Sequence, residues 1–160
     1  MRFIQYGGTR ALYRLRNLQE NPPLRHEIIP NLRYADAPRA IDFLCAAFGF
    51  QRRAVYPDDK DPRIIQHAQL TWRDRMVMIS SAMDSEHVRA AKMKTATEAG
   101  GITVGLYLIV EDVDAHAKRA RAAGAEIFDG PNDKDYGGRG YSARDPEGNV
   151  WSFGSYDPWA

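Results

Sequence analysis

Residues 136–153 read YGGRGYSARDPEGNVWSF, and this stretch decides more about the fold than any other. At its centre, Asp145-Pro146-Glu147-Gly148 has Asp first, Pro second and Gly fourth, which is the signature of a type I turn. We therefore predict a hairpin of two strands, at 139–143 and 149–156. The polar, glycine-rich segment 129–138 before it is predicted to be a loop.

The segments that precede this hairpin predict a strand, a helix and a second strand. Residues 102–110 form the first strand, and the side chain of Asp112 can cap a helix that runs through residue 123. Gly124 ends the helix as a left-handed cap, and 125–128 follows as a short strand.

The same order occurs earlier in the chain. Residues 27–34 predict a strand, Asp36 caps a helix that tolerates Pro38 in its first turn, and Gly49 ends it. Three more strands are expected, at 50–56, 64–72 and 75–80.

A shift of 76 residues aligns the two copies. It pairs Leu32 with Leu108, Asp36 with Asp112, and Ala46-Ala47 with Ala122-Ala123. Because caps, helices and glycine stops recur in one order, we interpret the chain as two βαβββ modules. Module one is 27–82 and module two is 101–157. A polar linker at 83–100, with a short helix near 85–94, joins them.

Composition excludes several classes of protein. The 160 residues include 22 basic and 21 acidic ones, a net charge of +1, whereas nucleic-acid binders are usually far more basic. One cysteine allows no internal disulfide, and no apolar run is long enough to span a membrane. We expect a cytoplasmic protein without nucleic-acid or membrane partners. Residues 1–26, with five arginines and one glutamate, form a basic N-terminal extension.

Five motifs together resemble a known family. They are IIPNLRYAD at 28–36, AFGF at 47–50, VEDVD at 110–114, AAGA at 122–125 and the stretch at 136–153. They resemble the vicinal oxygen chelate superfamily of glyoxalase I, bleomycin-resistance proteins and extradiol dioxygenases. The last motif is most similar to the bleomycin-resistance or PhnB-like branch. Over residues 27–157 the resemblance implies an α+β fold, in which two modules form a curled mixed sheet around a cavity, often in a homodimer.

The resemblance also implies where a divalent metal would bind. Family enzymes take His or Gln from the first strand of each module, and Glu or sometimes Gln from the last strand. The matching positions here are Ile29, Gly105, Met78 and Ser152, and none of them is an ordinary ligand of a divalent metal. We therefore expect no metal and no other cofactor.

The cavity wall follows from strand alternation. Ile29, Asn31 and Arg33 share one face of the first strand, which the resemblance makes concave. The same reasoning predicts a mixed wall of polar and apolar residues, typical of small-molecule sites. The predicted ligand-binding residues are Asn31, Arg33, His67, Gln69, Met78, Tyr107, Tyr136, Arg139, Tyr141 and Ser152.

Several of these residues have both a functional and a structural interpretation. His67 is the candidate catalytic residue, since imidazole exchanges protons near neutral pH, but it could equally satisfy a polar neighbour in the sheet. Arg33 suits either an anionic ligand or a structural ion pair. Tyr136, Arg139 and Tyr141 suit either stacking on a planar or cationic ligand or packing at an interface.

Three functions remain open from the sequence. The first is a metal-independent binding protein that sequesters a small molecule in the cavity between modules, as bleomycin-resistance proteins do. The second is a lyase or isomerase in which His67 is the base and Arg33 or Tyr107 stabilises negative charge. The third is a structural dimer whose cavity is vestigial.

Overall fold

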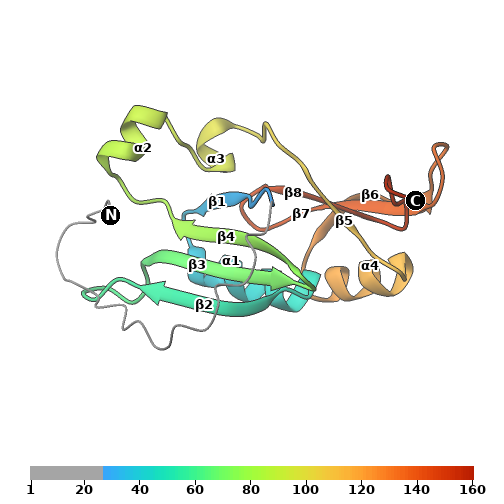
Figure 1. Cartoon of the computed structure of the whole chain (residues 1–160), viewed down its shortest axis with the longest axis horizontal. Helices are drawn as coiled ribbons and strands as arrows, with labels where there is room; N and C mark the ends of the chain where they lie inside the picture. Colours follow the sequence, from blue (N-terminus) through green and yellow to red (C-terminus); the bar gives the residue numbers. More distant parts are fainter. Residues whose placement is uncertain (1–26) are drawn as a thin grey trace, which may run out of the picture.

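The computed structural model describes residues 27–160, and the expected basic extension at 1–26 lies outside them. Two four-stranded mixed sheets with flanking helices confirm the predicted α+β fold (Figure 1). No helix within residues 27–160 is long and apolar enough to cross a bilayer. The elements of the first half are β1 (Asn31–Tyr34), α1 (Ala37–Phe43), the π-helical turn η1 (Leu44–Phe48), β2 (Gln51–Pro57), β3 (Ile65–Trp72) and β4 (Arg75–Ser81).

The second half repeats this order after a short helical linker. Its elements are α2 (Glu86–Ala91), α3 (Ala96–Ala99), β5 (Leu106–Ile109), α4 (Val113–Ala122), β6 (Glu126–Asp133), β7 (Arg139–Arg144) and β8 (Val150–Gly154). The sheets have equivalent strand orders, β1-β4-β3-β2 and β5-β8-β7-β6. In each sheet the first strand pairs in parallel with the last, and the other pairs are antiparallel.

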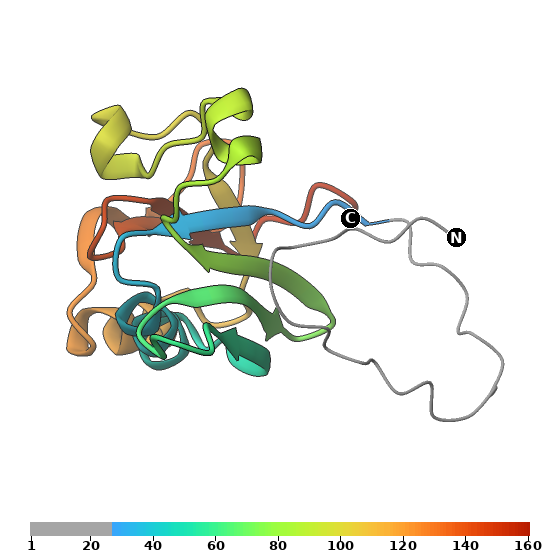
Figure 2. The same cartoon turned by 90° about the vertical axis from the view of Figure 1, so that its left-hand side faces the viewer.

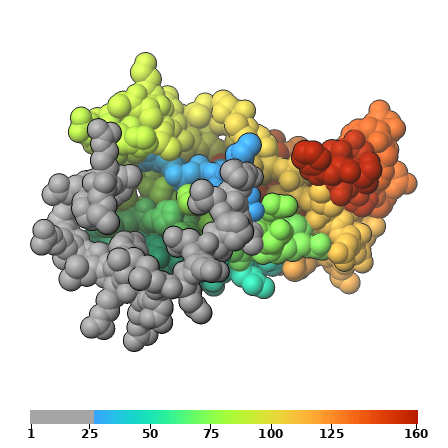
Figure 3. Space-filling view, in the orientation of Figure 1, coloured from blue at the N-terminus to red at the C-terminus, as the bar shows by residue number. Residues whose placement is uncertain are grey.

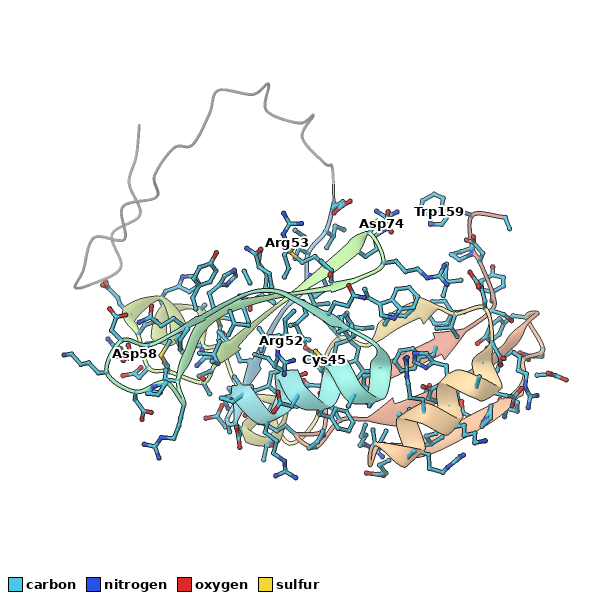
Figure 4. All side chains as sticks on the ribbon, turned by 90° about the horizontal axis from the view of Figure 1, so that it is seen from below. Cys45, Arg52, Arg53, Asp58, Asp74 and Trp159 are labelled. Carbon is cyan, nitrogen blue, oxygen red and sulfur yellow. The ribbon has the colours of Figure 1, made fainter. Side chains whose placement is uncertain are left out.

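The capping residues act as predicted. Asp36 accepts a hydrogen bond from the Arg39 amide at 3.1 Å, and Asp112 accepts one from the Ala115 amide at 2.9 Å. Gly49 ends η1 with φ 80° in the left-handed region. The π-helical turn carries Cys45 (Figure 4), whose pKa is raised mainly by burial, so its thiol stays protonated near neutral pH.

Four strands differ from the prediction, and one of them is β8, which ends at Gly154 instead of residue 156. The first strand of each module is shorter than expected, because only Asn31–Tyr34 and Leu106–Ile109 pair with a neighbouring strand. The strand predicted at 125–128 instead continues to Asp133, so part of the predicted loop at 129–138 belongs to β6. Pro131 lies within a register shift between Asp129 and Asn132, and an edge strand tolerates its missing N–H.

The linker at 83–100 contains two short helices rather than one. Ser85 caps α2, and Thr95 begins α3 with a capping box in which Thr95 and Glu98 bond to each other's backbone amides. Figures 1 and 2 both place α2 and α3 beyond the β1 edge of the first sheet.

Helix α1 packs on one face of the first sheet, α4 packs on one face of the second, and η1 contacts both helices. Together they share one core. Phe48 and Phe153 pack with ring centroids 4.8 Å apart, which joins η1 to β8. Arg119 of α4 donates to the Ala47 carbonyl at 3.1 Å. The helix side of each sheet is therefore closed, and the opposite side is left for a site. The largest fully buried side chains are Trp151, Tyr34, Tyr141, Phe48, Phe153, Leu44, Leu70 and Ile79.

Candidate functional site

A hollow of about 310 Å³ lies on the second sheet, on the side away from α4. Strands β5, β7 and β8 form its floor, and the segment between β6 and β7 forms its rim. Its lining comes only from module two: Gly105, Leu106, Tyr107, Asp129, Lys134, Tyr136, Gly137, Arg139, Gly140, Tyr141, Ser142, Ser152, Phe153 and Tyr156.

Two serine hydroxyls form the polar centre of the floor. Ser142 and Ser152 lie opposite each other on β7 and β8, and their Oγ atoms are 2.9 Å apart. Tyr107 lies next to Ser152 in the same register row. Each hydroxyl can both donate and accept, so the pair can bond to a ligand group of either kind.

Three tyrosines form an aromatic wall beside this floor. The hydroxyl of Tyr107 donates to the Tyr156 carbonyl at 2.9 Å, and Tyr136 meets Tyr156 edge to face at 5.6 Å. The pKa of Tyr107 is raised mainly by burial, so its hydroxyl remains a donor at neutral pH. A Cβ on Gly154 would lie 2.5 Å from the Tyr107 hydroxyl, so this glycine gives the ring its position.

The charges at the rim are paired with each other. Lys134 Nζ lies 2.7 Å from a carboxylate oxygen of Asp129, and this bond is the main reason that the pKa of Asp129 is lowered. Arg139 is engaged by Asp114 of α4 and by Asp133 of β6. Arg139 lines the hollow, but its guanidinium is already paired with carboxylates of its own chain, so its stacking on a ligand stays a prediction.

Tyr141 differs from the expectation. Its side chain is 1% exposed and lies on the helix side of β7, where its hydroxyl is 2.6 Å from His116 Nδ1. Only the strand backbone at this position can face the hollow. Its neighbours Gly140 and Ser142 alternate to the open side, which makes Tyr141 a core residue.

The predicted residues of module one lie on the open face of the first sheet. One register row holds Asn31, Met78 and Gln69, and Arg33 pairs with Ser80 two residues further along. His67 lies two residues before Gln69 on β3, and so on the same face. His67 stacks on Tyr56 at 6.0 Å, and its Nε2 is 3.4 Å from Gln69 Nε2. None of the module-one residues lines the hollow of module two. Within one chain the structure thus groups the predicted wall into two separate halves.

The residues at the family's metal positions do not fit a divalent metal. Met78 and Ser152 lie on β4 and β8, and Ile29 and Gly105 precede β1 and β5. An aliphatic side chain, a thioether, a glycine and a hydroxyl offer neither imidazole nor carboxylate donors. Among residues 27–160, no three His, Cys, Asp or Glu side chains cluster as a metal site.

Sequence reasoning missed several residues of the hollow, and Ser142, Asp129, Lys134 and Tyr156 are those with polar side chains. Ser142 could have been found, because the hairpin turn places it directly opposite Ser152. Asp129, Lys134 and Tyr156 gave no such signal. The first two lie in the segment interpreted as a loop, and Tyr156 lies beyond the end of β8.

The sequence is similar to a known protein family and to individual proteins. Residues 27–153 match the family model described as the Glyoxalase/Bleomycin resistance protein/Dioxygenase superfamily. Uncharacterized proteins of Mycobacterium bovis and Mycobacterium tuberculosis are each 36% identical over 127 residues. That alignment covers 78% of this chain and 80% or 71% of theirs.

Solved structures share the fold. TioX from Micromonospora sp. ML1 is 32% identical with a TM-score of 0.62, over 79% of this chain and 95% of TioX. TnmS3 from Streptomyces sp. CB03234, described as an antibiotic binding protein, is 21% identical with a TM-score of 0.60, over 84% of this chain and 98% of TnmS3.

Proposed function

Because the chain belongs to the Glyoxalase/Bleomycin resistance protein/Dioxygenase superfamily, we propose that it is a metal-independent small-molecule binding protein of the bleomycin-resistance type. It holds its ligand without changing any bond. The observation that carries the proposal is the hollow of about 310 Å³, where a serine pair adjoins three tyrosines and the rim charges neutralise each other. Such a site favours a planar ligand with a few polar groups.

The fold relationship supports a binding role. TnmS3 is described as antibiotic binding, and it shares the architecture rather than a close sequence with this chain. The ligand here need not be an antibiotic. What supports the proposal in this chain is its own set of groups, which offers hydrogen bonds and aromatic faces but no metal donors.

We further infer that a second copy of the chain completes the site. The first sheet has an open face that is lined by Asn31, Arg33, His67, Gln69 and Met78. Within residues 27–160, none of these side chains lines the hollow of module two. Figure 1 shows the two sheets following each other along the molecule's long axis. In a homodimer the first sheet of one protomer would cover the second sheet of the other, which would also bury apolar groups such as Ile109, now 37% exposed.

A lyase or isomerase activity based on His67 is the alternative. His67 reaches Gln69 and Tyr56, but within residues 27–160 no carboxylate hydrogen-bonds to its imidazole. A general base is usually oriented by such a partner. The arrangement therefore favours a binding role for His67 over a catalytic one.

A thermal-shift screen of small aromatic compounds tests the binding proposal. A ligand present at about 100 times its Kd stabilises the native state by about 2.7 kcal/mol, which raises Tm. Tyr136→Ala should reduce the shift given by a hit compound, because this ring is 61% exposed at the mouth of the hollow. Phe128→Ala is the matched control, since Phe128 is 45% exposed but does not line the hollow.

The outcomes separate binding in the hollow from a vestigial cavity. A shift lost in Tyr136→Ala and kept in Phe128→Ala supports binding in the hollow. Equal shifts in both variants contradict it. If no compound in a broad library raises Tm, the interpretation as a structural dimer with a vestigial cavity is the better one.

Elemental analysis of the purified protein tests the metal-independent part of the proposal. We expect no stoichiometric divalent metal and an unchanged ligand-induced Tm shift after treatment with a chelator. One metal ion per chain that is lost on His67→Ala would contradict the proposal and favour the enzyme.

A further inference from the structure

Arg33 on β1 is a buried cation with unused hydrogen-bonding capacity. Its side chain is 9% exposed and faces the open side of the first sheet, whereas Tyr34 beside it is fully buried on the helix side. Arginine does not lose its proton in proteins, so the buried group is charged at every working pH.

Only one of the three guanidinium nitrogens has an acceptor. Nη2 donates to the Met83 carbonyl at 2.8 Å, while Nε and Nη1 are buried without any hydrogen-bond partner. No carboxylate of residues 27–160 forms an ion pair with Arg33. Buried donors of this kind are rare and costly, and a charged donor more so.

Glu98, an acidic residue near Arg33, already accepts hydrogen bonds from Thr95. The pKa of Glu98 is lowered mainly by the backbone amide and hydroxyl of Thr95, and the charge of Arg33 adds to this effect. Both bonds from Thr95 go to the same carboxylate oxygen of Glu98, as part of the capping box of α3. Glu98 thus influences the guanidinium from a distance and leaves its two free nitrogens unpaired.

The linker at 83–100 lies beside Arg33, and Thr95, at 3% exposure, is its one buried residue. It begins at Met83, whose carbonyl accepts from Arg33, and neither α2 nor α3 has a buried side chain. Thr97 donates to the Glu147 carbonyl at 3.1 Å, and the linker ends at Gly100, a left-handed residue with φ 73°. Figure 3 shows the lime and yellow atoms of α2 and α3 as a ridge beside the blue atoms of β1.

We propose that Arg33 is an oxyanion subsite for the small molecule, and that the linker is its movable cover. A carboxylate or phosphate group of the ligand would accept hydrogen bonds from Nε and Nη1 once the linker moves away. This inference deepens the proposed function and rests on it, because Arg33 pairs with Ser80 on the open face of the first sheet, the face on which His67 and Gln69 also lie. Charge-assisted hydrogen bonds would then replace the unsatisfied donors.

Nitrogen-15 NMR of the full chain tests the subsite, because the Arg33 Nε–H group gives its own signal. Inorganic phosphate and benzoate serve as the two probes, with sodium chloride at matched ionic strength as the reference. We expect a saturable shift of the Arg33 signal with at least one probe. The signal is assigned by its disappearance in Arg33→Lys. Arg63, whose exposed side chain pairs with Asp61, serves as an internal control and should not saturate.

Equilibrium dialysis gives a second measurement that does not depend on the arginine signal. Loss of the guanidinium should weaken binding of the effective probe by about tenfold or more in Arg33→Lys, and Arg63→Lys should bind as the wild type does. A wild-type protein whose Arg33 signal does not saturate with either probe would overturn the subsite, whether or not the variant folds.

Hydrogen exchange of the backbone amides tests the cover. The bound probe should speed exchange within 86–99 in the wild type, and unchanged or slower exchange there would overturn the cover. A neutral aromatic compound that binds the hollow while both anions fail would overturn only the Arg33 subsite. If an anion binds at Arg33 but no aromatic compound binds in the hollow, the result would instead contradict the proposed function.

Discussion

Asp145 joins the two modules at the scale of a single residue. Its carboxylate accepts hydrogen bonds from the Tyr34 hydroxyl at 2.7 Å, the Asn149 amide at 3.0 Å and the Trp151 indole at 3.1 Å. Burial and the charge of Asp145 raise the pKa of Tyr34, so its hydroxyl remains a donor. The turn that identifies the fold in the sequence is thus also the contact that fixes one module against the other.

Replacing Asp145 by Ala should destabilise the protein strongly. Each buried donor that loses its acceptor costs about 1–3 kcal/mol, and four buried donor groups lose theirs, so we expect a loss of at least about 4 kcal/mol. Urea unfolding followed by tryptophan fluorescence measures it. Asp59→Ala, at an exposed position, should change stability by less than about 0.5 kcal/mol, and similar losses in both variants would contradict the role of Asp145.

His116 makes stability depend on pH. Its Nε2 lies 3.2 Å from the Phe48 carbonyl, which can only accept, so Nε2 carries the proton and Nδ1 accepts from the Tyr141 hydroxyl. Burial is the main cause that lowers the pKa of His116 from 6.5 to about 4. Because the native state favours the neutral ring, this contribution is complete above pH 6.5 and is lost as the pH falls towards 4.

The corresponding experiment compares His116→Gln with the wild type at pH 7 and pH 5. The wild type should lose more unfolding free energy between these values than His116→Gln does, and His87→Gln should behave as the wild type. Parallel losses in the wild type and His116→Gln would show that His116 does not carry the pH dependence.

Strand alternation predicts part of the site residue by residue. It places Asn31 and Arg33 on the open face of β1, and the register agrees with that placement. It cannot place Arg139, because the ion pair with Asp114 forms between β7 and α4, which lie apart in the sequence. The alternation of β7 puts Ser142 on the open side and the Tyr141 side chain on the helix side, next to His116 of α4.

At the scale of elements, two glycine caps end the helical segments and can be compared directly. Gly49 has φ 80° and Gly124 has φ 91°, so any other residue is strained at both positions. A Cβ at Gly49 would also lie 2.6 Å from the Arg119 guanidinium, whereas a Cβ at Gly124 would have no other atom within 4 Å.

We expect Gly124→Val to cost about 1–2 kcal/mol and Gly49→Val to cost more, because Arg119 must also leave its bond to the Ala47 carbonyl. Thermal unfolding measures both. Gly105→Ala is the control, since φ at Gly105 is not in the left-handed region and its Cβ would meet nothing. Unchanged Tm values for both valine variants would contradict the assigned caps.

The elements themselves were largely predictable, because caps and turns are local. Asp36, Gly49 and Asp112 each mark a helix end in the structure as they do in the sequence. The length of β6 was not predictable, since it depends on pairing with β7 across two register shifts. Strand ends of this kind are set by a partner strand rather than by composition.

At the scale of the whole molecule, the two separate halves of the wall predict a homodimer. Sedimentation equilibrium should give twice the mass of one chain. The ligand-induced Tm shift should fall when the protein is diluted far enough to dissociate, because each site needs both protomers. A chain that is monomeric at every concentration and still binds fully would contradict the shared site.

Native mass spectrometry of the protein with a compound found in the Tm screen tests the central claim most directly. The account predicts that, after treatment with a chelator, each site retains one ligand of unchanged mass and no metal ion. A ligand that returns with an altered mass, or that is lost together with a metal ion, would contradict a metal-independent binding protein.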